Sequence, residues 1–319
     1  MLPYIDLGFI KIPSYTLMLV VGVIAYALYT YFTLKKEGKD IRVIEKAFIV
    51  SILAFAVMGI TAFLFNSLFH SIEEGRLVLG GITWAGGVVG AFPAFVILTH
   101  FIIKEEKGSE IEFFSLVVPG IVLGHAFGRI GCFLAGCCYG NIAPDAFGVV
   151  FPAGSLAAHA HHGNLSTEPS WPVYPTQLYE AVFEFLLFAF MVVFKRKFKC
   201  SNAEIYLIAY GTFRFGLEFL RGDDRGSTGL LLSPSQILSV LLVVTGVLII
   251  LFKRKVIFKN LNDKLALWRE QVATGYLYKV ESQSTVYLND LDKLFTLYKK
   301  GAITEEEYLA KKNDILTKL

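Results

Sequence analysis

The sequence predicts an all-α integral membrane protein with a small soluble helical tail. Hydrophobic residues make up 55% of the 319 positions, charged residues only 18%, and the mean hydropathy is +0.56. Several apolar runs approach the roughly 20 residues that a helix needs to cross a bilayer. Basic residues gather in alternate loops between these runs, as expected of cytoplasmic loops. The net charge of +3 is too small to indicate nucleic-acid binding.

Seven of these runs are predicted to be transmembrane helices. The first has no basic flank before it and no small-residue cleavage pattern after it. We therefore interpret it as a retained span rather than a cleaved signal peptide. The predicted spans are at about 14–34, 45–69, 80–103, 111–134, 176–194, 203–220 and 233–252.

Loop charge predicts the orientation of the spans. Lys and Arg follow the first, third, fifth and seventh runs, whereas the segment 136–175 contains neither. Because basic loops stay in the cytoplasm, we expect the N-terminus outside and the C-terminus in the cytoplasm. The basic residues behind this assignment are Lys35, Lys36, Lys39, Arg42, Lys46, Lys104, Lys107, Lys195, Arg196, Lys197, Lys199, Lys253, Arg254, Lys255 and Lys259.

The chain is predicted to have a membrane domain, 1–257, followed by a linker, 258–285, and a helical hairpin, 286–319. Leu294 and Leu297 belong to an apolar stripe at helical spacing, and Gly301 breaks the pattern. Thr304 with Glu307 then forms the signature of a capping box. The hairpin resembles the short C-terminal (SHOCT) domain appended to many bacterial proteins. A generic helical hairpin is the alternative.

An arginine within the fourth apolar run is the first candidate site residue. Arg129 lies between Gly128 and Gly131, one helical turn after His125. An arginine at membrane depth is costly and therefore seldom accidental. Its planar guanidinium can hold a lipid phosphate through two parallel hydrogen bonds. Packing or topology alone is the alternative role for this residue.

Other spans carry their polar residues at the same predicted depth, near the outer membrane face. Tyr210, Arg214, Glu218 and Arg221 have the spacing of one helix face. Such charges are expected to face the bundle interior or a wet cavity. The matching polar residues of the fifth span are Gln177, Glu180 and Glu184, and the third span contributes Trp84, Gly86 and Gly87.

Each of these residues also has a structural interpretation. Arg214 and Glu218 suit an ion pair that joins helices, and Arg221 suits an anchor at the membrane interface. Gly86 and Gly87 first suggest close packing between helices.

Three cysteines follow the arginine of the fourth span, at or beyond the outer membrane face. The spacing Cys-x4-Cys-Cys matches no standard zinc motif, so no metal is expected. A disulfide between Cys132 and either Cys137 or Cys138, a reactive thiolate, and plain packing of small thiols all stay open. The histidines of the outer loop, His159, His161 and His162, are expected in a solvated flexible segment.

Residues 10–252 resemble the prolipoprotein diacylglyceryl transferase family of bacterial membrane enzymes. Members of this family have seven spans with the N-terminus outside. The stretches that carry the resemblance are Ile12 to Leu17, Gly81 to Gly90, Gly128 to Gly140, Tyr174 to Glu180, Tyr210 to Arg221 and Ser233 to Ser239.

The resemblance implies transfer of diacylglycerol from phosphatidylglycerol to the lipobox cysteine of a prolipoprotein in the bacterial inner membrane. Glycerol phosphate leaves and a thioether forms, and no cofactor is implied. Arg129 and Arg214 match the family's essential arginines, and Tyr210 matches its tyrosine one turn earlier. Spacing alone adds His125, one turn from Arg129, as the candidate base. Tyr210 is the rival base, and a core histidine bonded to a backbone carbonyl is the alternative role for His125. The candidate substrate-binding residues are Gly86, Gly87, Gly128, Gly131, Gln177, Glu180, Glu218 and Arg221, with a further chemical role open for Cys132, Cys137 and Cys138.

The chain departs from the family pattern around the reaction centre. Ala85 replaces the usual histidine of a His-Gly-Gly motif, and Tyr174 stands where a histidine is common. Cys132, Ala135 and Cys137 replace two asparagines and a glutamate. These changes leave two alternatives open: a relative that moves a lipid moiety to or within another acceptor, and a non-catalytic lipid-binding or transport protein.

Overall fold

The computed structural model describes residues 4–6, 8, 11–144, 146–163, 167–194, 201–222, 231–254, 267, 270 and 289–316. The chain divides into two compact units, Met1–Ile257 and Phe258–Leu319.

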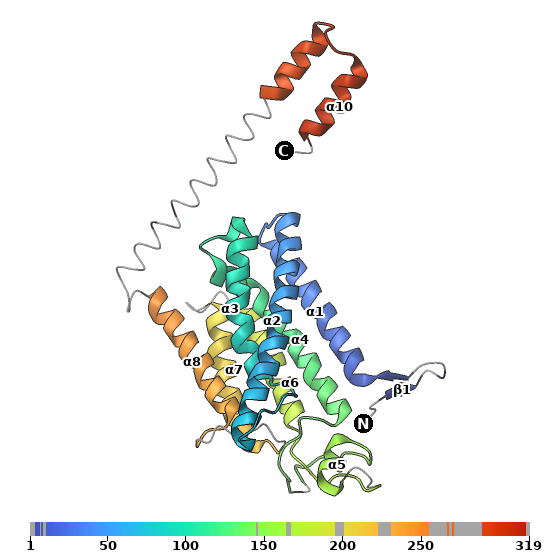
Figure 1. Ribbon diagram of the computed structural model, residues 1–319, viewed down its shortest axis with the longest axis vertical. Helices are drawn as coiled ribbons and strands as arrows, with labels where there is room; N and C mark the ends of the chain where they lie inside the picture. Colours follow the sequence, from blue (N-terminus) through green and yellow to red (C-terminus); the bar gives the residue numbers. More distant parts are fainter. Residues whose placement is uncertain are drawn as a thin grey trace. The chain divides into compact units, whose positions relative to one another are not determined.

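The first unit is a bundle of long helices, one at each predicted apolar run (Figure 1). Five of these helices are long and apolar enough to cross a membrane: α1, α2, α4, α6 and α8. In α3 the apolar part is shorter, Gly86–Ile102, and α7 has only 16 residues. The fold is thus consistent with an integral membrane protein, while seven spans and their orientation stay predictions. The bounds are α1 Ser14–Lys36, α2 Ile41–Glu74, α3 Trp84–Ile102, α4 Glu110–Ala135, α6 Thr176–Phe194, α7 Asn202–Leu217 and α8 Pro234–Lys253.

The helices begin and end where the local sequence supplies caps. At the start of α8, the Gln236 amide donates to the Ser233 hydroxyl at 3.2 Å, and the Ser233 amide donates to Gln236 Oε1 at 3.0 Å. This capping box satisfies amides that the helix itself leaves unpaired. The α4 helix ends at Gly136, whose φ of 73° is left-handed, a backbone that glycine adopts without strain.

Helix α4 lies at the centre of the bundle and packs directly on α1. A Cβ at Gly22 would lie 2.6 Å from the carbonyl oxygen of Gly124, and one at Gly131 would lie 3.1 Å from Met18 Cβ. The two backbones therefore touch, as is common for small residues in membrane helices. On its other faces α4 contacts α3, α6 and α7. This position lets α4 present its polar residues to three neighbouring helices.

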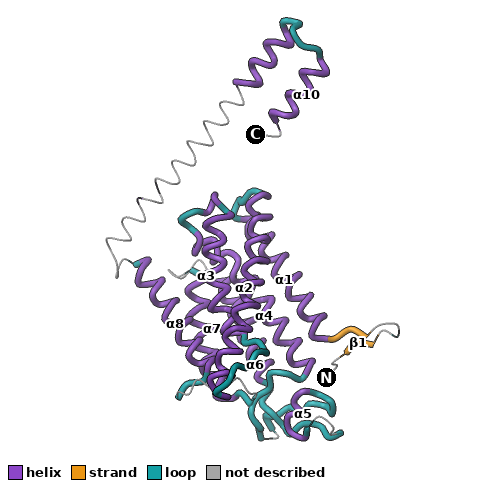
Figure 2. Tube along the Cα trace, viewed as in Figure 1, coloured by secondary structure: helices purple, strands orange, loops and turns teal. Residues whose placement is uncertain are grey.

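The segment between α4 and α6 folds over one end of the bundle and contains α5 (Leu156–His162) (Figure 2). Its backbone pairs Val149 with Val173, and His161 Nδ1 accepts a hydrogen bond from the Trp171 amide at 3.1 Å. Burial, and then the charge of the neighbouring His162, lower the pKa of His161, which favours the neutral ring that accepts this bond. The three histidines were predicted in a loop, but they lie in α5, and the segment has its own core of Tyr139, Phe151, Ala157 and Val173.

The end of α7 corrects a second prediction. The helix stops at Leu217, and Glu218–Leu220 form a 3₁₀ turn, η2. Arg221 then has an extended backbone with φ −75° and ψ 139° and bridges Gly140 of the outer segment. It does not continue the helical face of Tyr210 and Arg214, because pairing with the outer segment replaces helical hydrogen bonds.

A pair of short strands and a 3₁₀ turn also lie outside the apolar runs. Strand β1 (Tyr4–Asp6) pairs antiparallel with β2 (Lys11–Pro13), and Pro13 leads directly into α1. The 3₁₀ turn η1 (Lys104–Glu106) precedes α4. Its Glu106 forms an ion pair with Lys39 from the connection between α1 and α2.

The second unit contains a helical hairpin made of residues 289–299 and α10 (Glu305–Leu316). Gly301 between the helices has a left-handed φ of 71°. The predicted capping box is present, because the Glu307 amide donates to Thr304 Oγ1 at 3.3 Å and the Thr304 amide donates to Glu307 Oε2 at 3.0 Å. Across the hairpin, the rings of Tyr298 and Tyr308 stack at 4.8 Å. The predicted linker, 258–285, lies almost wholly outside the described residues.

Candidate functional site

The candidate site is a buried polar cluster between α3, α4, α6 and α7. At its centre, Arg129 Nε on α4 lies 3.0 Å from Glu180 Oε2 on α6. The Arg129 side chain is 7% exposed and that of Glu180 is fully buried. Charges this deep in a helix bundle need a partner, and the two residues supply it to each other. The sequence predicted the shared depth of these residues but not this pairing.

Tyr210 on α7 ties a third helix to this ion pair. Its hydroxyl donates to Glu180 Oε1 at 3.1 Å, while Oε2 faces Arg129 in the ion pair. The Tyr210 side chain is itself fully buried and stacks on Tyr206, one turn earlier, at 5.4 Å. Tyr210 therefore positions Glu180, and through it the guanidinium of Arg129.

His125 lies one turn before the arginine and is sandwiched by side chains from other helices. Its ring stacks on Trp84 of α3 at 3.7 Å with an interplanar angle of 10°. Its Nδ1 forms a close contact with Glu184 Oε1 of α6. The ring edge of Tyr210 lies on another side, at 5.9 Å between centroids. The imidazole is thus held by a carboxylate rather than by a backbone carbonyl.

A second cluster of charged and polar side chains is centred on Arg214, one turn beyond Tyr210. Its Nη1 lies 2.7 Å from Glu218 Oε2, and its Nη2 donates to Ser235 Oγ of α8 at 3.2 Å. Glu218 Oε1 in turn accepts from Ser233 Oγ at 2.9 Å. Arg214 and Glu218 therefore form the ion pair of the structural interpretation, and the two serines connect it to α8.

The two arginines bring their own counter-charges. Arg129 faces Glu180 and Arg214 faces Glu218, while Glu184 faces His125. An anion that enters this region must therefore compete with carboxylates for the guanidinium groups. The sequence did not predict which carboxylate pairs with which arginine. That depends on how neighbouring helices are aligned along each other and not on spacing within one helix.

The candidate glycines differ in what surrounds them. A Cβ at Gly128 would meet no atom within 4 Å, whereas a Cβ at Gly87 would lie 2.8 Å from Met58 Cγ of α2. Gly86 similarly faces Phe65 of α2, and Gly131 faces α1. Gly128 thus borders open space, and the other three pack helices together. A substrate-binding role for them stays a prediction.

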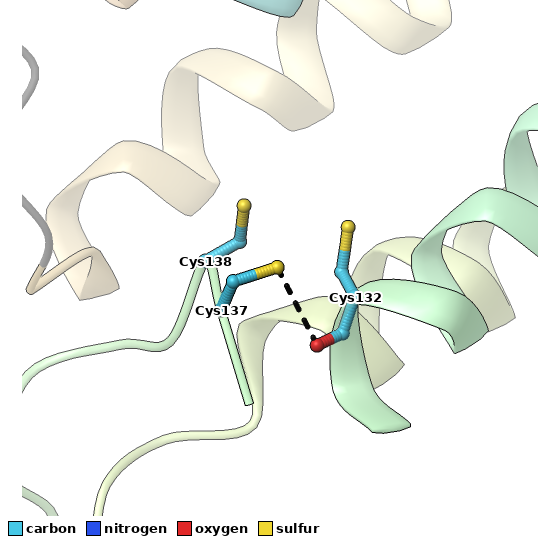
Figure 3. Close-up of side chains that lie close together, drawn as sticks. All are labelled: Cys132, Cys137 and Cys138. Atoms are coloured by element: carbon cyan, nitrogen blue, oxygen red, sulfur yellow. Dashed lines mark hydrogen bonds between the residues drawn. The ribbon is translucent and has the colours of Figure 1, made fainter. Parts of the chain in front are cut away.

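The three cysteines follow directly from the arginine helix. Cys132 is buried in the last turn of α4, and Cys137 and Cys138 lie in the turn that follows Gly136. None of the three is in a disulfide, so of the alternatives left open the structure does not support the disulfide. The Cys137 thiol donates to the carbonyl oxygen of Cys132 at 3.6 Å (Figure 3).

Helix α6 holds this cysteine turn against the site. Fully buried Gln177 donates from Nε2 to the Cys137 carbonyl at 2.6 Å, and Thr176 Oγ1 donates to the Cys138 carbonyl at 2.9 Å. Gln177 lies almost one turn before Glu180 on the same helix. The cysteine turn and the Arg129 ion pair are therefore positioned by neighbouring turns of α6.

Comparison with known proteins assigns the membrane unit to a family. The model of prolipoprotein diacylglyceryl transferase matches residues 3–252. The chain belongs to this family. The short C-terminal domain matches residues 290–316. Both resemblances inferred from the sequence are thus confirmed.

Curated members of the family align over most of their length. A phosphatidylglycerol–prolipoprotein diacylglyceryl transferase 2 of Clostridium perfringens is 32% identical over 246 residues, covering 75% of this chain and 90% of the relative. The Clostridium tetani enzyme of the same activity is 31% identical over 245 residues, covering 75% and 92%. A Dehalococcoides mccartyi enzyme is 27% identical over 262 residues, covering 78% and 92%.

Within this family fold, the structure brings together most of the predicted site residues. His125, Arg129, Glu180 and Tyr210 form one cluster, and Arg214 with Glu218 forms the next. Gln177 joins the cysteine turn, and Arg221 is buried where the outer segment meets η2. Sequence reasoning noted Glu184, Trp84 and the Ser233–Ser239 motif but did not assign them contacts. The signal that could have marked them as site residues is the occurrence of polar side chains within apolar runs of the sequence.

Proposed function

We propose that this protein transfers the diacylglyceryl group of phosphatidylglycerol to the lipobox cysteine of a prolipoprotein. The observation that carries the proposal is the buried Arg129–Glu180–Tyr210 cluster inside the region matched by the family. The names of the curated relatives state both substrates. A buried guanidinium suits the binding of a lipid phosphate, which it can hold through two parallel hydrogen bonds.

In the proposed reaction the acceptor sulfur attacks the glyceryl carbon that bears the phosphate. A sulfur–carbon bond forms, the carbon–oxygen bond breaks, and glycerol phosphate leaves with the electron pair. Negative charge therefore grows on the phosphate in the transition state. Donors fixed in advance around that charge lower the barrier. Arg129 and Arg214 are the cations proposed to hold the phosphate. In this proposal the phosphate replaces Glu180 and Glu218 as the partner of some guanidinium nitrogens.

His125 is proposed to act as the base that removes the thiol proton. Ala85 replaces the usual histidine of the family, and His125 is the histidine of the described buried cluster. Glu184 holds its Nδ1, as a carboxylate orients an imidazole in many acid–base sites. Tyr210 is the rival candidate, but its hydroxyl donates to Glu180, which makes it a positioning residue in this proposal.

The membrane arrangement is part of the same proposal. Seven spans with the N-terminus outside would place the segment 136–175 and the polar cluster near the outer face of a bacterial inner membrane. The acceptor signal peptide would reach the site from that face. Residues 1–257 would form the membrane transferase domain, 258–285 the linker, and 286–319 a cytoplasmic hairpin to which no partner is assigned.

A second candidate function is transfer of a lipid moiety to or within another acceptor. The observation that favours it is the altered reaction centre, where Ala85, Cys132, Ala135 and Cys137 stand at the family's polar positions. A non-catalytic lipid-binding or transport protein is the third candidate.

Rescue of a bacterial strain depleted of its own prolipoprotein diacylglyceryl transferase tests the proposal. Expression of this chain should restore growth and lipid-modified lipoproteins, and the Arg129→Lys variant should not. Failure to rescue by a protein that inserts and accumulates normally would reject the prolipoprotein as acceptor. Glycerol phosphate release without a lipobox peptide would favour the second candidate.

A further inference from the structure

The cysteines after α4 form a compact group of metal-binding atoms. The three sulfur atoms of Cys132, Cys137 and Cys138 all lie within 4.8 Å of one another. The thiols of Cys132 and Cys138 point to the same side, and that of Cys137 turns towards Cys132 (Figure 3). A tetrahedral zinc ion with bonds of about 2.3 Å to sulfur needs sulfur atoms about 3.8 Å apart. The spacing of the three sulfur atoms is therefore within about 1 Å of the one that zinc needs.

The backbone that carries these thiols is held in place from several directions. The Cys137 amide donates to the Cys132 carbonyl at 3.1 Å, and α6 side chains bind the carbonyls of Cys137 and Cys138 at 2.6 and 2.9 Å. Cys138 has a left-handed φ of 61°, which no other described non-glycine residue adopts. Such a backbone persists only where surrounding contacts impose it. The turn is therefore built to present its side chains in a defined geometry.

The number and surroundings of the thiols indicate an open site rather than a closed one. Structural zinc sites have four protein ligands, whereas reactive sites have three and leave the fourth position for a substrate. Here three thiols converge, and Cys137 and Cys138 are only half-buried. Arg129 lies one turn before Cys132 on α4, so its guanidinium partly offsets the charge of three thiolates.

We propose that Cys132, Cys137 and Cys138 bind Zn²⁺ and that the fourth position takes the thiol of the acceptor peptide. The sequence spacing had suggested no metal, but spacing along the chain does not report how the turn brings the thiols together. A thiol bound to zinc gives up its proton, here to His125, and reacts as a thiolate. Its sulfur then bonds to the glyceryl carbon as the carbon–oxygen bond breaks and glycerol phosphate leaves.

This inference rests on the proposed transfer reaction and explains one of its difficulties. The family histidine is replaced by Ala85, and two of the altered polar positions are Cys132 and Cys137. Zinc coordination would lower the pKa of the acceptor thiol directly. His125 would then assist by taking the proton that coordination releases.

Metal content of the purified full-length protein is the first test. Wild-type protein prepared with zinc should hold about one Zn²⁺ per chain, and each single Cys→Ser variant at the three positions should lose most of it. Cys200→Ser is the matched control and should keep its zinc. Poor folding of a variant would also remove zinc, so a second measurement uses wild-type protein. Zinc should protect its three thiols from alkylation, as counted by mass. Unchanged zinc in the triple variant, or no protection, would overturn the proposal.

Cobalt tests the open position. Co²⁺ in place of zinc should give an intense thiolate-to-metal absorption band and the visible bands of a tetrahedral ion. A lipobox peptide with cysteine should change these bands, and the same peptide with serine should not. If the cysteine peptide leaves the cobalt spectrum unchanged, the acceptor thiol does not occupy the fourth position of the metal, and that part of the proposal is rejected. Normal transfer by zinc-free protein would reject the zinc role and leave the proposed function intact, whereas zinc binding without transfer would reject the function.

Discussion

Replacement of Glu180 by Gln isolates the electrostatic core of the site. Glu180 is fully buried, lies 3.0 Å from Arg129 Nε, and accepts from the Tyr210 hydroxyl at 3.1 Å. Glutamine has the same shape and keeps one acceptor oxygen, but it removes the negative charge. Arg129 would then be a buried cation without its counter-ion.

The expected loss of stability follows from that unpaired charge. Breaking a buried ion pair by removal of one partner costs about 3–5 kcal/mol. On the scale of soluble domains of 150–250 residues, this corresponds to a fall in Tm of roughly 6–20 °C. Glu105→Gln is the matched control, because its partner Lys46 and Glu105 itself are 32% and 28% exposed. A pair this accessible contributes only about 0–1 kcal/mol.

Thermal unfolding in detergent with added lipid measures both effects. If Arg129 binds the lipid phosphate, phosphatidylglycerol should supply the missing negative charge and raise the Tm of Glu180→Gln more than that of wild type. A neutral diacylglycerol should not do so. The reasoning would be refuted if Glu180→Gln unfolded at the temperature of Glu105→Gln, or if phosphatidylglycerol stabilised both proteins equally.

The other predictions concern the arginines, the base and the orientation. Arg129→Lys and Arg214→Lys keep the charge but lose the planar fork, so transfer by purified protein should fall by about 10²-fold or more; near-normal rates in both would contradict the phosphate role. His125→Gln should slow turnover most where an imidazole is neutral, and full activity across about pH 6–8 would exclude it as the base. A tag at Leu319 should be reached by an impermeant label only after the cells are opened, and labelling of intact cells would refute the orientation.

The helical framework could be predicted because apolar length and loop charge are local properties. The run predicted at 176–194 coincides with α6, and that at 111–134 differs from α4 by one residue at each end. The folded outer segment could not be predicted, because it depends on pairing between Val149 and Val173 across 24 positions. The turn at Arg221 has the same origin, since its partner Gly140 is remote in sequence.

The residues of the site were easier to predict than the contacts between them. Charged residues in apolar runs are conspicuous, so Arg129, Glu180 and Arg214 were found from the sequence. Their partners depend on how far one helix slides along another, which the contact of Gly22 with Gly124 helps to set. No sequence signal specified that Tyr210 would donate to Glu180. The convergence of the three cysteine thiols likewise arises from a turn whose geometry depends on α6.

Transfer of labelled lipid by the purified protein tests the central claim most directly. Phosphatidylglycerol labelled in its acyl chains is incubated with the protein and a lipobox peptide carrying cysteine or serine. The account predicts a thioether-linked diacylglyceryl peptide with cysteine only, equimolar glycerol phosphate, and loss of both products in Arg129→Lys. Folded protein that forms no lipidated peptide, or that releases glycerol phosphate equally without peptide, would contradict it.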